Sequence, residues 1–191
     1  WCDDVAQATD KSYDEVQAYL VAWFTMFVAP NQSEGKKITA RSVLQTLGTE
    51  FGRNIDNDVW VKVAKAAADD LLAGRGVYDR TQGVIPGAST GAKQTDVVVI
   101  TDGRFRNEVL AVNSWGGATI KIWNPKATGL TGEAGKHASE TEQDTIPDWW
   151  FTATLMNNKE HGLEPLRRCT RALADDLFVG SAEIRRGHSR F

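Results

Sequence analysis

The chain has 191 residues, 41% of them hydrophobic and 25% charged, with a formal net charge of −3. This composition is typical of one globular domain with a sizeable core and excludes an intrinsically disordered chain. The small negative net charge gives no indication of the positively charged surface that binds duplex nucleic acid, so we expect no nucleic-acid partner. The apolar stretch 18–29 has 12 residues. It is shorter than the roughly 20 residues that cross a bilayer, so it predicts a buried core helix and no membrane partner.

Helices dominate the predicted first part of the chain. Segment 13–28 has helical length and acids in its first turn. Thr39 is the predicted N-cap of a second helix, in which apolar residues recur at helical spacing. A third helix over 58–73 ends at Gly74. Residues 74–95 are rich in Gly, Ser, Thr and Gln, which predicts a surface loop or a loose hairpin.

Strands and helices alternate in the second half. Residues 96–101 (DVVVIT) form a continuous apolar run, as expected for a strand that is covered on both faces. The elements predicted after it are a helix over 105–115, a strand at 118–123, a long polar segment at 124–147, a strand at 150–155 and a helix over 162–178. This order predicts the α/β class, with a parallel sheet and flanking helices.

Asp102 and Arg104 directly follow the predicted strand 96–101. Ligands of open parallel sheets bind at the carboxyl ends of the strands. A carboxylate there can hold Mg²⁺ through water, and a guanidinium can bind a phosphate in bidentate fashion. The pair therefore predicts a phosphate-handling site. The alternative, which the spacing fits about as well, is an Asp-Gly turn followed by a surface arginine that pairs with Glu108.

Further cations accompany this pair. Arg41 lies on the second predicted helix, where a lone arginine is commonly just solvated. The polar segment 124–147 is unusually long for a compact domain unless it forms a lid or a binding loop. A lid that closes on phosphates needs cations, and this segment contains Lys126, Lys136 and His137. Simple solvation is the alternative for all three. His137 has no His or Cys partner at a metal-ligand spacing.

Four segments together carry a family resemblance: RSVLQTLGTEFGR, NDVWV, ITDGRFRNE and GLTGEAGKHASE, followed by a strand and MNN. In this order they resemble the deoxynucleoside monophosphate kinases of tailed bacteriophages, over roughly residues 39–178. The resemblance implies a P-loop nucleoside monophosphate kinase fold. It also implies transfer of the ATP γ-phosphoryl group to a deoxynucleoside monophosphate with Mg²⁺, in the cytoplasm of a phage-infected host cell. ATP and the deoxynucleoside monophosphate are the implied partners, and the seven tryptophans leave room for an apolar homodimer face.

The same resemblance implies a domain map. The whole chain, 1–191, is expected to form a single kinase-like domain. Its expected parts are a helical acceptor-binding region (13–74), core strands and a helix (96–123), a lid (124–147), and a C-terminal strand and helix (150–178).

Residue roles follow from the matching positions. Asp102 is expected near the magnesium ion, which it holds through water, and Arg104 is expected on the acceptor phosphate. Arg41 and Gln45, one turn apart, are expected to line the acceptor pocket. Trp60 is a candidate for a base contact, although a tryptophan at helical spacing is commonly a core residue. These assignments agree with the chemistry, because phosphoryl transfer depends mostly on positioning and charge neutralisation.

The lid is expected to contain Lys126, Lys136, His137 and Glu140. Where the family usually has an arginine at the entry to the lid, this chain has Asn124. An arginine there stabilises charge on the transferring phosphate, and a lysine is a point charge that does not replace its planar fork.

The phosphate-binding sequence G-x-x-x-x-G-K-[ST] is a second departure, because the 191 residues do not contain it. GASTGAKQT (87–95) has the wrong glycine spacing and precedes a predicted strand. We expect the P-loop, with its strand and helix, upstream of Trp1. The alternative is a non-catalytic relative that acts as a nucleotide-binding or phage structural or accessory protein. An α/β domain of unrelated role is a third possibility.

Overall fold

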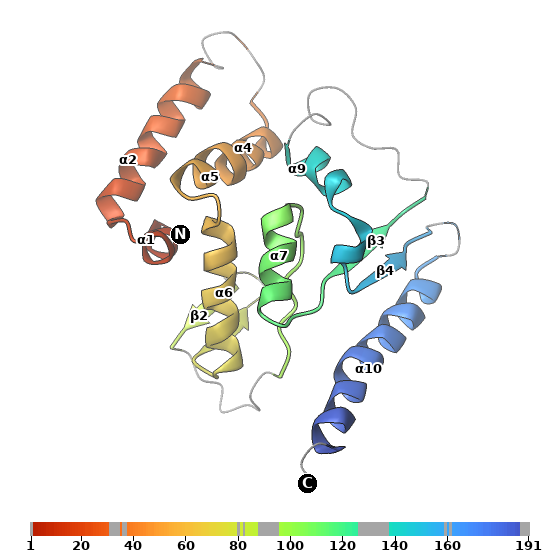
Figure 1. Ribbon diagram of the computed structural model, residues 1–191. Coiled ribbons are helices and arrows are strands. Elements are labelled where there is room, and N and C mark those ends of the chain that lie inside the picture. Colours follow the sequence, from red (N-terminus) through yellow and green to blue (C-terminus); the bar gives the residue numbers. More distant parts are fainter. Residues whose placement is uncertain are drawn as a thin grey trace. The chain divides into compact units, whose positions relative to one another are not determined.

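A computed structural model describes residues 2–30, 35, 38–79, 81, 83–87, 96–125, 138–158, 160 and 162–187. The fold is mostly helical, with two small two-stranded sheets, one of them parallel (Figure 1). The chain divides into two compact units, Trp1–Gly103 and Arg104–Phe191. This boundary falls inside the predicted core region 96–123, and the single kinase-like domain stays a prediction. Within the described ranges, no helix has both the length and the hydropathy that a membrane span requires.

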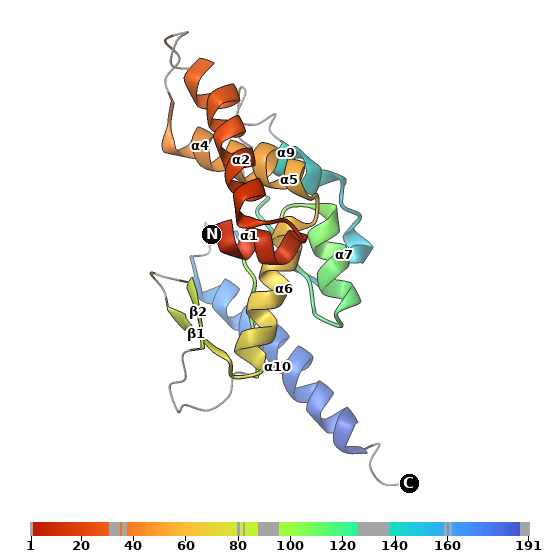
Figure 2. The ribbon, with the colours of Figure 1, turned by 90° about the vertical axis from the view of Figure 1, so that its left-hand side faces the viewer.

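The first unit combines helices with a hairpin. Its elements are α1 (Cys2–Thr9), α2 (Tyr13–Trp23), the π-helical turn η1 (Phe24–Val28), α4 (Ala40–Thr46), the π-helical turn η2 (Leu47–Phe51), α5 (Gly52–Ile55), α6 (Val59–Leu72), β1 (Gly76–Asp79) and β2 (Gly83–Pro86). The three predicted helices are confirmed. β1 and β2 pair antiparallel, with Gly76 opposite Pro86, so the loose hairpin is confirmed as well (Figure 2).

Side-chain caps begin two of these helices. The Glu15 backbone N–H donates to Ser12 Oγ (3.2 Å), and the Ser12 backbone N–H donates to Glu15 Oε2 (2.8 Å). These bonds satisfy amides that have no partner within a helix. The hydrogen bond from the Ser12 backbone, followed by that from its hydroxyl, lowers the pKa of Glu15. Thr39 caps α4 as predicted, because its Oγ1 accepts from the Ser42 backbone N–H (3.1 Å).

Four buried side chains form the core of the first unit. Val5, Val16, Phe51 and Val59 come from α1, α2, η2 and α6, and the three valines are fully buried. Half-buried apolar residues surround them: Cys2, Ala6, Leu20, Trp23, Leu47, Ile55, Trp60 and Val63. Burial of apolar surface at this one cluster therefore holds elements that are far apart in sequence.

A carboxylate joins α5 to α6. Asp56 Oδ1 accepts from the Asp58 backbone N–H (2.8 Å), and Asp56 Oδ2 pairs with Lys62 Nζ. The hydrogen bond from Lys62 is the largest cause that lowers the pKa of Asp56, and it outweighs partial burial. The same bond raises the pKa of Lys62. Each charge therefore stabilises the other in the folded state.

The second unit contains the parallel pair of strands. Its elements are α7 (Arg106–Ser114), β3 (Ile120–Trp123), α9 (Ala138–Thr141), the 3₁₀ turns η3 (Glu142–Thr145) and η4 (Asp148–Trp150), β4 (Ala153–Met156) and α10 (Glu164–Gly187). β3 and β4 run parallel, with Ile120 opposite Ala153 and Trp123 opposite Met156. The predicted helices of this half and its last two strands are confirmed, although β4 begins three residues later than predicted.

The predicted strand at 96–101 is wrong. Residues 97–104 have no regular secondary structure, and of the described strands next in sequence, β2 pairs with β1 and β3 with β4. Val99 is 79% exposed, and Val97 and Ile100 are exposed as well. A β-branched run has strand propensity, but a strand exists only where a neighbour satisfies its backbone groups. Among the described residues, this run has no such ladder.

Replacing Val16 by alanine should destabilise the first unit by about 2 kcal/mol, because the side chain is fully buried and its loss leaves a cavity. Val21→Ala is the matched control on the same helix, since Val21 is 60% exposed, and it should change stability by less than about 0.5 kcal/mol. Urea unfolding of both variants measures the difference. Equal losses would contradict the proposed core.

Asp56→Asn should lower the free energy of unfolding by about 0.5–1 kcal/mol near neutral pH, as expected for a partly exposed ion pair. A lowered Asp56 pKa gives stability that is present above about pH 4, the unfolded value, and is lost as the pH falls through the folded pKa. A raised Lys62 pKa gives stability that is present below about pH 10 and is lost as the pH rises through the folded pKa. The difference between wild type and variant should therefore vanish in acid, in urea titrations over a pH series.

Candidate functional site

Asp102 and Arg104 fall on opposite sides of the boundary between the two units. Asp102 is exposed and has a φ of 70°, a left-handed conformation that few residues other than glycine adopt. Aspartate tolerates it better than most, because its short side chain can hydrogen-bond locally. Arg104 is half-buried and lies just before α7. The structure thus places both residues in the turn that leads into α7, as the predicted helix start at 105 required.

Carboxylates occupy the N-terminal end of α7. Glu108 Oε2 accepts from the backbone N–H groups of Arg104 (2.7 Å) and Phe105 (3.0 Å). Glu142 Oε1 accepts from the backbone N–H of Arg106 (3.0 Å). The positive end of a helix dipole favours negative charge at this position, and the three consecutive amides bind it directly. Glu108 thus contacts Arg104 through its backbone N–H, and the alternative pairing of Glu108 with the arginine side chain stays a prediction.

Glu142 is a residue that the sequence analysis missed. It lies in η3 and reaches a backbone N–H that is 36 positions earlier in the chain. Its sequence neighbourhood, ETEQD, contains several acids and gives no sign of which one is used. Only the path of the chain from β3 to β4 brings it to α7, so a local pattern could not have identified it.

Arg41 and Gln45 lie one turn apart on α4, as predicted. Arg41 is exposed and Gln45 is half-buried. The Nε2 atom of Gln45 is buried and makes no hydrogen bond to any residue that the structure describes. A buried amide donor is normally satisfied by protein, water or ligand. Whether Gln45 lines an acceptor pocket stays a prediction.

Trp60 is tied into the core of the first unit. Its indole Nε1–H donates to the Gly48 carbonyl (2.5 Å), and the ring packs beside the buried cluster. A Cβ at Gly52 would overlap the indole, so this ring position requires glycine there. These contacts match the core alternative for Trp60, and its contact with a base stays a prediction. The sequence feature that could have pointed to this packing is the glycine at 52, eight residues before the tryptophan.

The predicted lid is only partly visible. Lys126, Lys136 and His137 lie outside the described residues. Glu140 lies in α9, of which only the backbone is described at that position. Asn124 is half-buried directly after β3. The lid roles of these residues stay predictions.

Metal binding depends on Asp102 in the predicted scheme. In the part of the chain that the structure describes, no three His, Cys, Asp or Glu side chains gather into a metal-binding group. Mg²⁺ in kinases is held by one or two carboxylates together with substrate phosphates and water. A single carboxylate such as Asp102 is therefore compatible with a magnesium ion that arrives with ATP.

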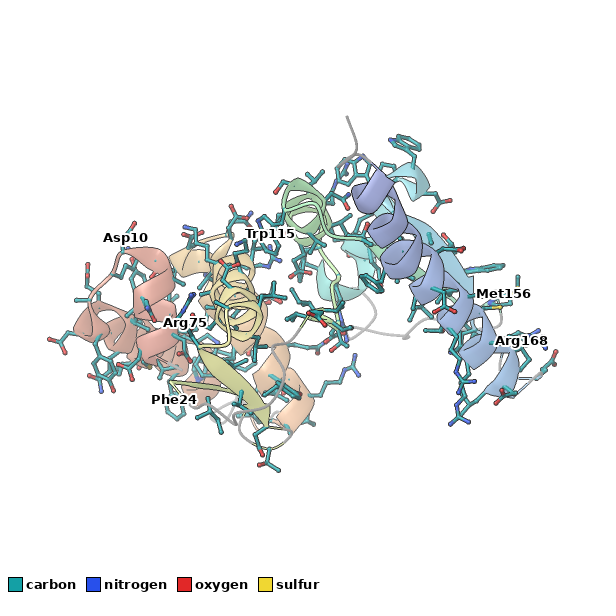
Figure 3. All side chains as sticks on the ribbon, turned by 90° about the horizontal axis from the view of Figure 1, so that it is seen from below. Asp10, Phe24, Arg75, Trp115, Met156 and Arg168 are labelled. Carbon is teal, nitrogen blue, oxygen red and sulfur yellow. The ribbon has the colours of Figure 1, made fainter. Side chains whose placement is uncertain are left out.

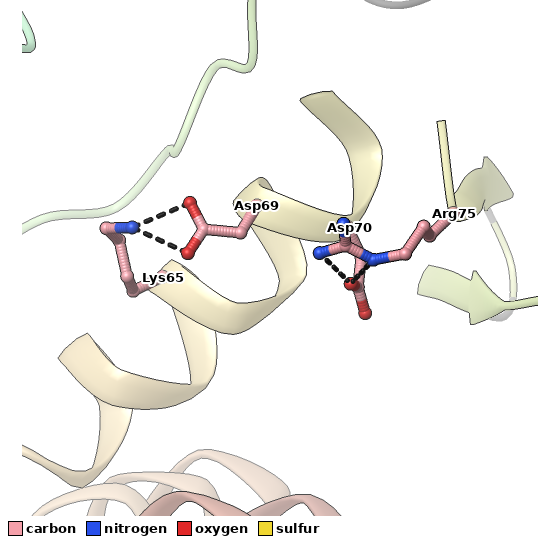
Figure 4. Close-up of polar contacts among 4 residues, drawn as sticks. All are labelled: Lys65, Asp69, Asp70 and Arg75. Atoms are coloured by element: carbon pink, nitrogen blue, oxygen red, sulfur yellow. Dashed lines mark hydrogen bonds and ion pairs between the residues drawn. The ribbon is translucent and has the colours of Figure 1, made fainter. Parts of the chain in front are cut away.

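Other charged groups have structural roles. Lys65 Nζ contacts both carboxylate oxygens of Asp69 at 2.6 Å, and Arg75 Nε donates to Asp70 Oδ1 at 2.9 Å (Figure 4). The second pair fastens the end of α6 to the residue that precedes β1.

In the second unit, Met156 is 58% exposed at the end of β4 (Figure 3).

Gly52→Ala should destabilise the first unit by about 1–3 kcal/mol, because the new methyl group displaces the Trp60 indole. Gly48→Ala is the control: a Cβ there meets no atom within 4 Å, and the carbonyl that binds Trp60 is kept. It should be neutral or slightly stabilising, since alanine favours helix. Thermal unfolding, followed by tryptophan fluorescence, compares the two variants. A Gly52→Ala protein as stable as Gly48→Ala would refute the close ring contact.

Comparison with known proteins assigns no family. No protein-family model matches the chain, and no curated protein or solved structure shows significant similarity to it. The function is therefore inferred from the residues and their geometry.

Proposed function

We propose that this protein is a deoxynucleoside monophosphate kinase with a P-loop nucleoside monophosphate kinase fold. It transfers the γ-phosphoryl group of ATP to a deoxynucleoside monophosphate with Mg²⁺, in the cytoplasm of a phage-infected bacterium. The observation that carries the proposal is the segment 100–108 (ITDGRFRNE): it puts an acid and an arginine directly before a helix whose first amides bind carboxylates. Because Glu108 and Glu142 already occupy these amides, the phosphate of the proposed site is bound by the Arg104 guanidinium, which can bind it in bidentate fashion.

The parallel pairing of β3 and β4 supports the fold. Parallel strands need a long crossover, and the chain between Trp123 and Ala153 supplies one. α7 comes directly before β3, which is the helix–strand half of the strand–helix–strand rhythm of doubly wound folds. The lid of the proposed kinase lies in this crossover, between the two paired strands.

In the proposed site, charge neutralisation and positioning do most of the work. Asp102 holds the magnesium ion through water, and Arg104 binds the acceptor phosphate with its planar fork. Arg41 and Gln45 bind the acceptor from α4. Gln45 lies one turn from Arg41 on α4, which supports placing both at the acceptor.

The lid adds cations in the proposed mechanism. The phosphates are covered by the cations of the lid, Lys126, Lys136 and His137. Glu140 belongs to the same lid. Lys126 compensates in part for Asn124, which stands where an arginine is expected. Closure would also exclude water from the reacting phosphates.

A non-catalytic nucleotide-binding protein, serving as a phage structural or accessory component, is the second candidate. One observation favours it: Asn124 stands at the lid entry, where the kinases that the chain resembles usually have an arginine. A coupled assay of ADP release with each deoxynucleoside monophosphate separates the candidates. Turnover supports the kinase, and binding of nucleotide without turnover supports the second candidate. If calorimetry also detects no nucleotide binding, both are wrong.

Arg104→Ala should lower kcat/KM for the deoxynucleoside monophosphate by about 100-fold, because a phosphate loses its bidentate, charge-assisted partner. Arg106→Ala is the matched control, since this exposed arginine two positions later lies over the Trp150 ring (5.0 Å). The control should keep activity within a few fold. Circular dichroism checks that both variants are folded. Near-normal kinetics for Arg104→Ala would remove this residue from the site.

A further inference from the structure

Asp102 and Gly103 form a dipeptide on the surface, in the turn that leads into α7. Both residues are exposed, and neither belongs to a helix or a strand. Asp102 has a left-handed φ of 70°. This is the one Asp-Gly sequence among the 191 residues, and the chain contains no Asn-Gly. An exposed, left-handed aspartate is thus combined with a following glycine at this position.

Such a dipeptide has the groups for aspartate isomerisation. The backbone nitrogen of Gly103 attacks Cγ of Asp102, and the new C–N bond closes a succinimide ring. A carboxyl oxygen leaves as water, with the proton of that nitrogen and the proton of the acid. Water then opens the ring: breaking the bond between nitrogen and Cγ restores aspartate, and breaking the bond between nitrogen and the main-chain carbonyl carbon gives isoaspartate. The second step consumes the water that the first released, so the product has the mass of the starting chain.

The local structure favours ring closure. Glycine has no Cβ, so no side-chain atom of residue 103 shields the nitrogen from the carboxyl group. Residues 97–104 have no regular secondary structure, whereas ring closure within a helix or a strand would break a ladder of backbone hydrogen bonds. The amides that donate to Glu108 belong to Arg104 and Phe105, so neither of them is the reacting nitrogen. The start of α7 can therefore keep its cap while the ring forms.

We propose that Asp102 is a site of isoaspartate formation in the folded protein. The left-handed φ costs free energy in an aspartate. In isoaspartate the main chain runs through Cβ, and the additional methylene group removes that restriction. The product lengthens the turn before α7 by one main-chain carbon and attaches the carboxylate directly to Cα. The proposal does not depend on the kinase activity, because the reaction needs only the chain and water.

Incubation of the full 191-residue chain in neutral buffer at body temperature tests the proposal. Trypsin cleaves after lysine and arginine, so it releases residues 94–104 as one peptide at each time point. Electron-transfer fragmentation in a mass spectrometer then distinguishes isoaspartate from aspartate. The same peptide contains an internal control, Asp96, because the branched Val97 follows it. Isoaspartate should accumulate at Asp102 at least about tenfold faster than at Asp96.

Asp10 separates the effect of the glycine from that of the backbone conformation. It is likewise exposed and left-handed, with a φ of 53°, but Lys11 follows it. Isoaspartate should form at Asp10 as slowly as at Asp96, and Gly103→Ala should slow its formation at Asp102 by about tenfold. Equal rates at the three aspartates, or an unchanged rate in Gly103→Ala, would overturn the proposal.

The same chain unfolded in urea gives the rate without tertiary structure. The proposal requires the folded chain to react at a rate within about tenfold of the unfolded chain, as expected for a segment outside the protected ladders. Isoaspartate at Asp102 in urea, with none in the folded chain, would overturn the proposal, because the fold would then protect this dipeptide.

Discussion

Two parallel strands can pair only if the chain between them returns to the starting end of the sheet, and this constraint organises the second unit. β3 ends at Trp123 and β4 begins at Ala153, so the connection must be long and must be held in place. The hydrogen bonds around Thr119 hold its last part where β4 begins. Even so, two strands alone make a marginal sheet. The packing of Phe105, Val109 and Ile146, all buried, supplies apolar burial for this unit.

The first unit depends on close packing in a small core. Its fully buried side chains are valines, so its core is small and each close contact matters. The indole of Trp60 adds a large apolar surface, but only because Gly52 leaves room for it. This arrangement bears on the site, since η2 and α5 follow directly from α4, the helix of Arg41 and Gln45. The position of these two side chains thus depends on a packing contact outside the proposed pocket.

The sequence allowed the helices to be predicted because their signals are local. Thr39 bonds an amide three residues away, and Gly74 takes up a left-handed φ of 69° at the end of α6. The strand at 96–101 could not be judged in this way, because a strand depends on a partner elsewhere in the chain. The site shows the same division. Asp102 and Arg104 were singled out because they follow the predicted strand 96–101, which the structure does not contain, whereas Glu142 depends on a contact across 36 positions.

The exposed side chains of Val97, Val99 and Ile100 have a consequence for the behaviour of the protein in solution. β-branched side chains that lie outside any ladder of the described residues can pair with strands of other molecules, and such segments promote aggregation. Asp96 and Asp102 flank the run, and charges in such places act as gatekeepers against intermolecular pairing. Salt screens those charges, so colloidal stability should be greatest at low ionic strength.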